Sequence, residues 1–419
     1  MRSSDRRRLR PVARVEISEK NKKLRLALLV LSLVVAAAAL TFALTQALNT
    51  DPGWMVIEAS TSELNCGSDF VFNYCFVGEG ADATLPRKRL TEIYTDAVET
   101  AYLLFNKDVQ TDRFHNLYDV NAAVNQPIEV HPVLYDAFEL LNCYKNRGIF
   151  LAPVYVEYHR IFHCASPEEA MAYDPYQNPQ LMPYITQLAS FANDPDAISV
   201  QLLENNRVCL TVSEEYLAFA REYEIEQFLD FSWLKNGFIA DYIAGTLEDN
   251  GFTNGYLTSY DGFTRNLDRR SERYSFNIFD RVANDIYRPA VMHYNQPMSL
   301  VYLRNYPMGD SDRWHYFGFS NGRIANLMID PADGVDKAAQ DSLVTYSSVY
   351  GCAELLLQMY PVYIADAFVP EQLATLAEKQ VYSIWCHEQT LLFTERELKV
   401  ELLEVAPGVS YTAEWFSVK

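Results

Sequence analysis

One stretch of this 419-residue chain combines residue types and spacings that could do chemistry. It begins at Asn236 and Gly237, continues into an amphipathic run that contains Asp241, and after a glycine-punctuated break ends in a short β-prone run and Asp261-Gly262. A helix, turn, strand and turn of this kind often bind a ligand at their junctions, and glycine allows the backbone to approach that ligand closely. The stretch is therefore the first candidate for a binding site.

Other motifs give less support for catalysis. His159 and His163 stand four residues apart, which on a helix would place both on one face, but no HExxH glutamate and no third ligand accompany them. Ordinary polar packing is therefore favoured over a metal site. The chain has no GxSxG, P-loop or GxGxxG motif, so serine hydrolase and dinucleotide-binding folds lack support.

The N-terminus predicts a membrane anchor. Residues 1–25 carry ten basic residues against three acidic ones, a local charge of +7, and the next 23 residues, Leu26 to Leu48, are uncharged. A helix of that length spans roughly 34 Å, enough for the hydrocarbon layer. The basic flank should stay in the cytoplasm, which places the rest of the chain outside. A cleaved signal peptide is the alternative, although the apolar run is long for one. We expect a juxtamembrane linker and the start of the ectodomain over 49–85, and the main extracytoplasmic domain over 86–419.

The net charge of the part that follows the predicted anchor limits which binding partners are expected. With a net charge of −20 for the whole chain, about −27 is left for the part after the anchor, which disfavours nucleic acid and anionic membrane surfaces. The seven cysteines contain no CxxC pair. Cys66 and Cys75 could form a disulfide outside the membrane, and the other cysteines are more simply buried apolar residues.

Local patterns predict mixed secondary structure. We expect helices over about 86–105, from Pro132, over 213–223 and over 350–365, and a β-hairpin around Glu204–Asn206. Residues 165–195 look like a surface excursion with one helix, whose role the sequence does not reveal. Strands and helices do not alternate regularly, which favours an α+β fold over a doubly wound sheet.

The candidate stretch also resembles a known signature. The sequence DFSWLKNGFIADYIAGTLEDNGFTNGYL, which overlaps this stretch, is similar to the motif of the ApbE-type FAD:protein FMN transferases. The positions that match the motif are Asp230, Gly237, Phe238, Asp241 and the Asn250-Gly251 turn, and Asp261-Gly262 falls where Gly-Gly is usual.

Three further stretches resemble the same family in the family's order. YFGFSNGRIANLMIDPADG retains the spacing of an Ile-Asp-Pro-x-x-Gly turn, SLVTYSSVYGCAELLLQMYP looks like the strand and metal-binding helix, and LNCYKNRGIFLAPVY looks like a third turn. The residues retained are Ile329, Asp330, Pro331 and Gly334, and Gly148, Phe150 and Pro153.

The resemblance implies a flavin-transferase-like α+β body and a magnesium-dependent reaction. FMN would pass from FAD to a serine or threonine of an extracytoplasmic flavoprotein, and AMP would leave. Magnesium would neutralise the pyrophosphate. The nucleotide would contact Asn236, Gly237, Asp241, Asp261, Gly262 and Asp330, and the metal would bind Glu354 and Gln358, which share one helix face.

Several chemical positions depart from the family pattern. Asn236 stands where the family has lysine, Asp261 where it has glycine, and Leu327 where it has histidine. Glu354 and Gln358 replace an aspartate and a threonine. Glutamate is one methylene longer than aspartate, and glutamine is a longer, neutral amide in place of the threonine hydroxyl. Leucine cannot act as a base, and no other residue is identified as the catalytic base.

Two main hypotheses follow. The chain is either an active FMN transferase or a catalytically lapsed relative that binds a flavin, a nucleotide or a partner protein. A glycan- or peptide-binding module is a third alternative, supported only by the 28 tyrosines and 23 phenylalanines. For Asp241 and Asp330, a purely structural role in capping helices and fixing turns stays open.

Overall fold

The computed structural model describes residues 30, 53–60, 69–77, 83–283 and 285–417. The predicted membrane segment, 26–48, lies outside these residues apart from Val30, and so does Cys66, one half of the suggested disulfide. Among the described residues, no helix is both long enough and apolar enough to cross a bilayer.

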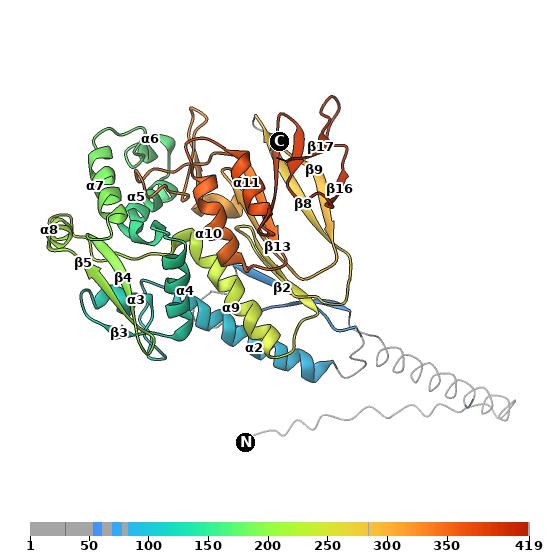
Figure 1. The fold of residues 1–419 in the computed structure, drawn as a ribbon, viewed down its shortest axis with the longest axis horizontal. Helices are drawn as coiled ribbons and strands as arrows, with labels where there is room; N and C mark the ends of the chain where they lie inside the picture. Colours follow the sequence, from blue (N-terminus) through green and yellow to red (C-terminus); the bar gives the residue numbers. More distant parts are fainter. Residues whose placement is uncertain (1–29, 31–52, 61–68, 78–82, 284, 418–419) are drawn as a thin grey trace, which may run out of the picture.

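A nine-stranded sheet forms the centre of the body (Figure 1). In spatial order its strands are β1 (Trp54–Ile57), β2 (Phe70–Cys75), β6 (Gly255–Ser259), β7 (Phe263–Asn266), β10 (Met298–Arg304), β13 (Ser342–Ser347), β14 (Tyr382–His387), β15 (Thr390–Phe393) and β17 (Thr412–Trp415). Neighbouring strands are antiparallel except for the parallel pair β15 and β17.

Both faces of the central strands are covered. Every residue of β10 and β13 is buried, and alternate residues of β10 enter different cores. Leu300 and Tyr302 pack with Met292 of a second sheet, whereas Val301 and Leu303 pack in the core beside the helices. Because successive side chains of a strand point to opposite faces, the two cores lie on opposite sides of the sheet. The second sheet has the order β16 (Lys399–Leu402), β9 (Asp285–Tyr294) and β8 (Tyr274–Val282).

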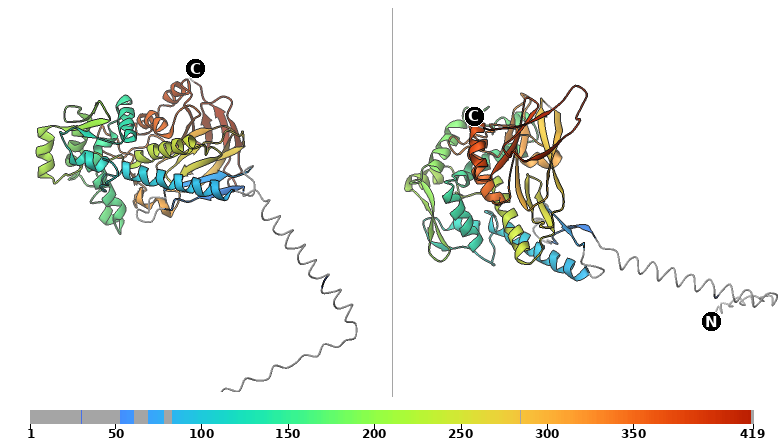
Figure 2. Two further views of the ribbon diagram at one scale, coloured as in Figure 1. Left: turned by 90° about the horizontal axis from the view of Figure 1, so that it is seen from below. Right: turned by 45° about the vertical axis from the view of Figure 1, so that its right-hand side comes forward.

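Helices cover the other face and separate the sheet from a helical lobe (Figures 1 and 2). The covering helices are α2 (Thr84–Leu104), α9 (Lys235–Asp249), α10 (Cys352–Tyr363) and α11 (Pro370–Ala377). The lobe contains α3 (Leu117–Ala122), β3 (Ile128–Glu129), α4 (Pro132–Cys143), η3 (Gly148–Leu151), α5 (Ala152–His163), α6 (Pro167–Ala170), α7 (Met182–Asn193), β4 (Ile198–Leu203), β5 (Arg207–Val212) and α8 (Glu214–Glu222). Short elements complete the fold: η4 (Ser232–Leu234), η5 (Asp310–Trp314), β11 (Tyr316–Gly318) and β12 (Ile324–Asn326).

The local predictions are largely confirmed, and so is the mixed α+β character. The helices expected over 86–105, from Pro132, over 213–223 and over 350–365 are α2, α4, α8 and α10. The predicted hairpin is β4 and β5, with Asn205 and Asn206 at φ values of 61° and 52°, as a tight hairpin turn requires. The prediction for residues 165–195 is wrong in part. The segment holds two helices, α6 and α7, and Ile185 and Leu188 of α7 are buried in the main core and not on the surface.

Candidate functional site

A cavity of about 260 Å³ lies between α2, α5, the start of α9 and the turn from β6 to β7. Most of its polar lining comes from loops. The polar residues are Asp69, Asn106, Lys107, Asp108, His159, Asp230, Ser232, Lys235, Asn236, Asp261 and His315. Apolar lining includes Tyr102, Phe105, Trp233, Ile239 and Leu327. This mixed lining suits a ligand with one aromatic and one polar part, and the volume lies just below the usual range for small-molecule sites.

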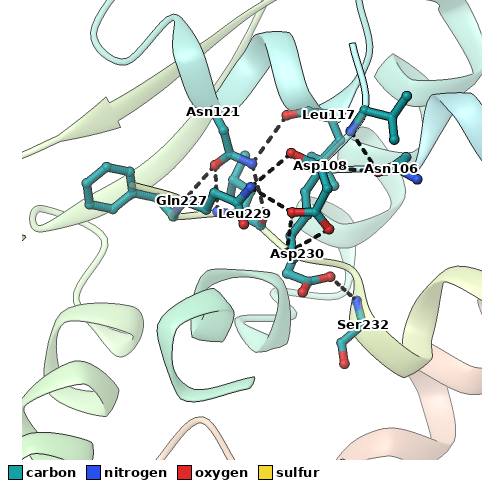
Figure 3. A network of polar contacts seen from close by, with 11 residues as sticks. Asn106, Asp108, Leu117, Asn121, Gln227, Leu229, Asp230 and Ser232 are labelled. Atoms are coloured by element: carbon teal, nitrogen blue, oxygen red, sulfur yellow. Dashed lines mark hydrogen bonds and ion pairs between the residues drawn. The ribbon is translucent and has the colours of Figure 1, made fainter. Parts of the chain in front are cut away.

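A buried asparagine on the lobe fixes one wall of the cavity (Figure 3). The side chain of Asn121 on α3 accepts hydrogen bonds from the backbone N–H groups of Phe228 and Leu229, both at 2.9 Å, and donates to the carbonyl of Leu229 at 3.0 Å. Gln227 next to them donates its amide to the carbonyl of Lys107 at 3.0 Å. These bonds bring the 227–230 segment beside the 106–108 loop, so both contribute to one cavity.

The chain then turns sharply into α9. The carboxylate of Asp230 accepts the backbone N–H of Ser232 at 2.7 Å, which holds Ser232 at a φ of 46°. A left-handed conformation is uncommon for serine and is maintained by its surroundings. Ser232 is only 8% exposed, and its hydroxyl has no hydrogen-bond partner in the described part of the chain.

Two lysines give the cavity a cationic side. Lys107 pairs with Asp108 at 2.8 Å. Burial opposes ionisation of Asp108, but hydrogen bonds from Lys107 and Gln227 and the charges of Lys107 and Lys235 hold its pKa below the usual value. Lys235, the first residue of α9, makes no ion pair with any described residue.

His159 on α5 stands on the same side. Burial, with help from the charges of Lys107, His315, Lys235 and His163, lowers the pKa of His159 to about 4. The imidazole is therefore neutral at pH 7 and offers one nitrogen as donor and one as acceptor. His163, four residues later, makes ordinary polar and ring contacts. Its Nδ1 lies 2.7 Å from the backbone carbonyl of His159, and its ring contacts Trp314.

His159 should make the protein less stable in acid. Its pKa falls from 6.5 to about 4 on folding, so between those pH values the unfolded chain binds a proton there that the folded chain does not. Stability is therefore lost as the pH falls through this window. We expect His159→Gln to remove part of that loss, measured as urea midpoints from pH 7 to pH 4. His163→Gln on the same helix is the control and should follow the unchanged protein; equal slopes for all three proteins would contradict the placement of His159.

The β6–β7 turn closes the opposite side. The carboxylate of Asp261 accepts hydrogen bonds from the Asn236 amide at 2.8 Å and from the Ser259 hydroxyl. Burial raises the pKa of Asp261, although both hydrogen bonds and the charge of His315 act against the rise. Gly262 follows at a φ of 109°, and a Cβ there would lie 2.3 Å from the carbonyl oxygen of Tyr302. A side chain at this position would clash with strand β10, so packing within the protein requires the glycine.

Two of the predicted nucleotide contacts lie in a helix junction, away from the cavity lining. The carboxylate of Asp241 accepts the backbone N–H groups of Cys352 and Ala353, both at 2.8 Å, and lies 3.4 Å from Arg265. It thus caps the start of α10. Gly237 packs on the same helix, where an added Cβ would lie 3.3 Å from the Cα of Ala353.

Asp330 also has partners within the protein. Its carboxylate pairs with Lys337 at 2.8 Å and accepts the backbone N–H of Ala332, and it is not part of the cavity lining. Lys337 additionally pairs with Asp333 and Asp366, both at 2.7 Å. The aspartate therefore ties the turn that carries it.

The predicted metal ligands do not fit a magnesium site. Glu354 accepts a hydrogen bond from the Tyr144 hydroxyl at 2.6 Å, and the side-chain nitrogen of Gln358 is buried without a partner. Neither residue lines the cavity. Across the described ranges, no three His, Cys, Asp or Glu side chains come close enough to hold a metal together. Magnesium prefers carboxylate oxygens in near-ideal octahedral geometry, and one engaged carboxylate with a neutral amide is a poor set.

The structure thus brings Asn236 and Asp261 together and leaves the other predicted contacts outside the cavity. Reasoning from the sequence missed Lys107, Ser232 and Lys235. Lys235 directly precedes Asn236 and was available as a signal, whereas Lys107 lies in a loop more than a hundred residues earlier with no motif around it.

The fold of this chain is similar to that of a solved ApbE protein. No protein-family model and no curated protein sequence matches the chain. The solved ApbE protein of Thermotoga maritima MSB8 is 10% identical, with a TM-score of 0.54, over 79% of this chain and 94% of its own. The flavin transferase ApbE of Vibrio cholerae is 13% identical over 83% of this chain and 96% of its own, with a TM-score of 0.48. The chain therefore has the fold of the Thermotoga maritima ApbE protein.

Proposed function

We propose that the protein binds a flavin nucleotide in this cavity. One observation carries the proposal: separate stretches that resemble the flavin-transferase signature meet there. Asp230 and Asn236 come from the first stretch, Asp261 from its end, and Leu327 from the second. These residues are up to about a hundred positions apart in the sequence, and they line one small cavity.

The cavity chemistry supports a flavin as the ligand. Trp233 stacks on Tyr360 with ring centroids 5.4 Å apart and an interplanar angle of 18°, which holds the indole in place, and Trp233 also lines the cavity. A fixed aromatic plane suits a flat ring system. Lys107 and Lys235 supply positive charge for a phosphate.

We further propose that binding occurs without transfer of FMN to a partner. Leu327 lines the cavity where the resemblance places a basic histidine. Glu354, proposed for magnesium, is engaged by Tyr144. FMN transfer to a flavoprotein is the second candidate function, favoured by the fold. For either function we propose that the domain lies outside the cytoplasm, held by the single membrane segment predicted over 26–48.

The test is a titration of the full-length chain with FAD and FMN, followed by flavin fluorescence. We expect saturable binding with partial quenching by Trp233. Trp233→Ala should weaken it about tenfold or more, because stacking of a planar base on an aromatic ring contributes about 1–3 kcal/mol.

Glu354→Gln is the matched control outside the cavity and should leave flavin affinity unchanged. Release of AMP from FAD is measured in the same samples with magnesium and a serine-containing flavoprotein acceptor. Flavin binding without AMP release supports the proposal. AMP release that Glu354→Gln abolishes would favour the transferase, and no flavin binding at all would reject both candidate functions.

A further inference from the structure

We propose that Lys235, with Lys107 and the Ser232 hydroxyl, forms an anion site that holds the phosphate of the ligand directly, without a bound divalent cation. The ligand class is a phosphate ester or a pyrophosphate. The inference rests on the proposed flavin-nucleotide function, which it deepens by assigning the residues and the charge that recognise the phosphate.

The partners already present in the cavity point to an anion. Three lining carboxylates are engaged by the protein: Asp108 by Lys107 and Gln227, Asp230 by the Ser232 backbone, and Asp261 by Asn236 and Ser259. The fourth, Asp69, is exposed at the edge. Of the two lining lysines, Lys235 is the one without an ion-pair partner among the described residues, whereas Asp230 and Asp261 are held by neutral hydrogen-bond donors. An anionic ligand would give Lys235 a direct partner.

The hydroxyl of Ser232 is a second, independent indication that the cavity binds a polar ligand group. The residue is 8% exposed, it lines the cavity, and its hydroxyl has no partner in the described chain, although buried hydroxyls are normally hydrogen-bonded. Its strained backbone is held by Asp230, whose pKa is raised by burial. Ser232 at the start of η4 and Lys235 at the start of α9 both line the cavity. A phosphate between them would accept a hydrogen bond from the hydroxyl and from the ammonium group.

The same residues explain why a metal is not needed. A divalent cation at a phosphate supplies positive charge close to its oxygens. Three of the four lining carboxylates, Asp108, Asp230 and Asp261, already accept hydrogen bonds within the protein. The predicted metal ligand Glu354 lies outside the cavity lining and accepts a hydrogen bond from Tyr144. Lysine ammonium groups neutralise phosphate as point charges. Lys107 is only 18% exposed and Lys235 half-buried, so their charges are screened less than those of surface lysines.

The experiment compares three probes on the full-length chain: FMN, riboflavin and inorganic pyrophosphate, each titrated calorimetrically with excess EDTA and again with excess magnesium. We expect FMN to bind more tightly than riboflavin, and we expect EDTA to leave the affinity for FMN unchanged. Lys235→Met should weaken FMN and pyrophosphate by about tenfold to a hundredfold and riboflavin by less than twofold. Lys235→Arg should restore part of the loss.

Lys88→Met, at a 74%-exposed position on α2, is the matched control and should change nothing. If Lys235→Met fails to fold, Lys107→Met gives the same comparison with a smaller expected effect, because that lysine is already paired. Equal affinity for FMN and riboflavin overturns this inference while the flavin-binding function stands. Pyrophosphate binding that depends on Lys235, without binding of either flavin, supports the anion site and rejects the flavin. Loss of FMN binding in EDTA overturns the inference, as does the failure of all three probes.

Discussion

Replacement of Gly262 by alanine is expected to destabilise the protein by about 3–5 kcal/mol. The residue has a φ of 109°, which side-chain-bearing residues rarely adopt, and an added Cβ would lie 2.3 Å from the carbonyl oxygen of Tyr302. That oxygen belongs to a central, fully buried strand, and the Tyr302 backbone N–H also donates to the Gly262 carbonyl at 2.9 Å. The turn cannot move away without losing this bond, so the overlap must distort the β6–β7 turn. The shift of the urea midpoint measures the effect.

Gly245→Ala is the matched control for this substitution. Gly245 lies in the middle of α9, and an added Cβ there meets no atom within 4 Å. Alanine favours a helix over glycine by about 0.5–1 kcal/mol, so this change should stabilise the protein slightly. If both alanine variants unfold at the same urea concentration, the close approach of Gly262 to Tyr302 is wrong.

Removal of the Asp312 carboxylate should cost about 3–5 kcal/mol of stability. A guanidinium nitrogen of Arg304 lies 3.0 and 3.1 Å from the two oxygens of Asp312, and the two residues are 4% and 5% exposed. The carboxylate also accepts the backbone N–H of Met308 at 2.6 Å. In Asp312→Ala a buried guanidinium is left without its counter-charge. Chemical denaturation of the two proteins gives the difference in unfolding free energy.

Asp96→Ala serves as the comparison for that ion pair. Asp96 pairs with Arg113 at a similar distance, 3.0 Å, but their side chains are 72% and 43% exposed. Exposed pairs contribute only about 0–1 kcal/mol because water and salt screen them. A loss in Asp312→Ala no larger than in Asp96→Ala would show that the Arg304 pair is open to solvent.

The sequence predicted the elements that depend on neighbouring residues. The start of α4 followed from Pro132 in its first turn, and the β4–β5 hairpin followed from consecutive asparagines that tolerate positive φ. The α+β class and the resemblance to the flavin-transferase fold were also visible. Each of these depends on a local pattern, so no knowledge of distant contacts was needed.

The site residues were harder to predict because their partners are far away in the chain. Asp241 binds backbone groups more than a hundred residues later, and Glu354 binds Tyr144 at a separation of 210 residues. A carboxylate that caps a helix and one that contacts a ligand look the same in sequence. Gly262 was identified as a place of close approach, but the approaching group is a strand of the protein, which only the sheet register reveals.

The contact between Gln227 and Lys107 holds together the two ends of the helical lobe. The chain leaves the body after α2 and returns to it before α9 at points joined by two hydrogen bonds from the Gln227 amide, to the Lys107 carbonyl at 3.0 Å and to the Asp108 carboxylate at 2.9 Å. The helical lobe is thus an insertion with adjacent ends, and the strands of the nine-stranded sheet all lie outside it. Segments with close ends can change length without disturbing the register of the sheet that receives them. The surface loops of the lobe can therefore change length, whereas α5 and α7, whose Tyr158 and Ile185 are buried in the main core, must keep their packing.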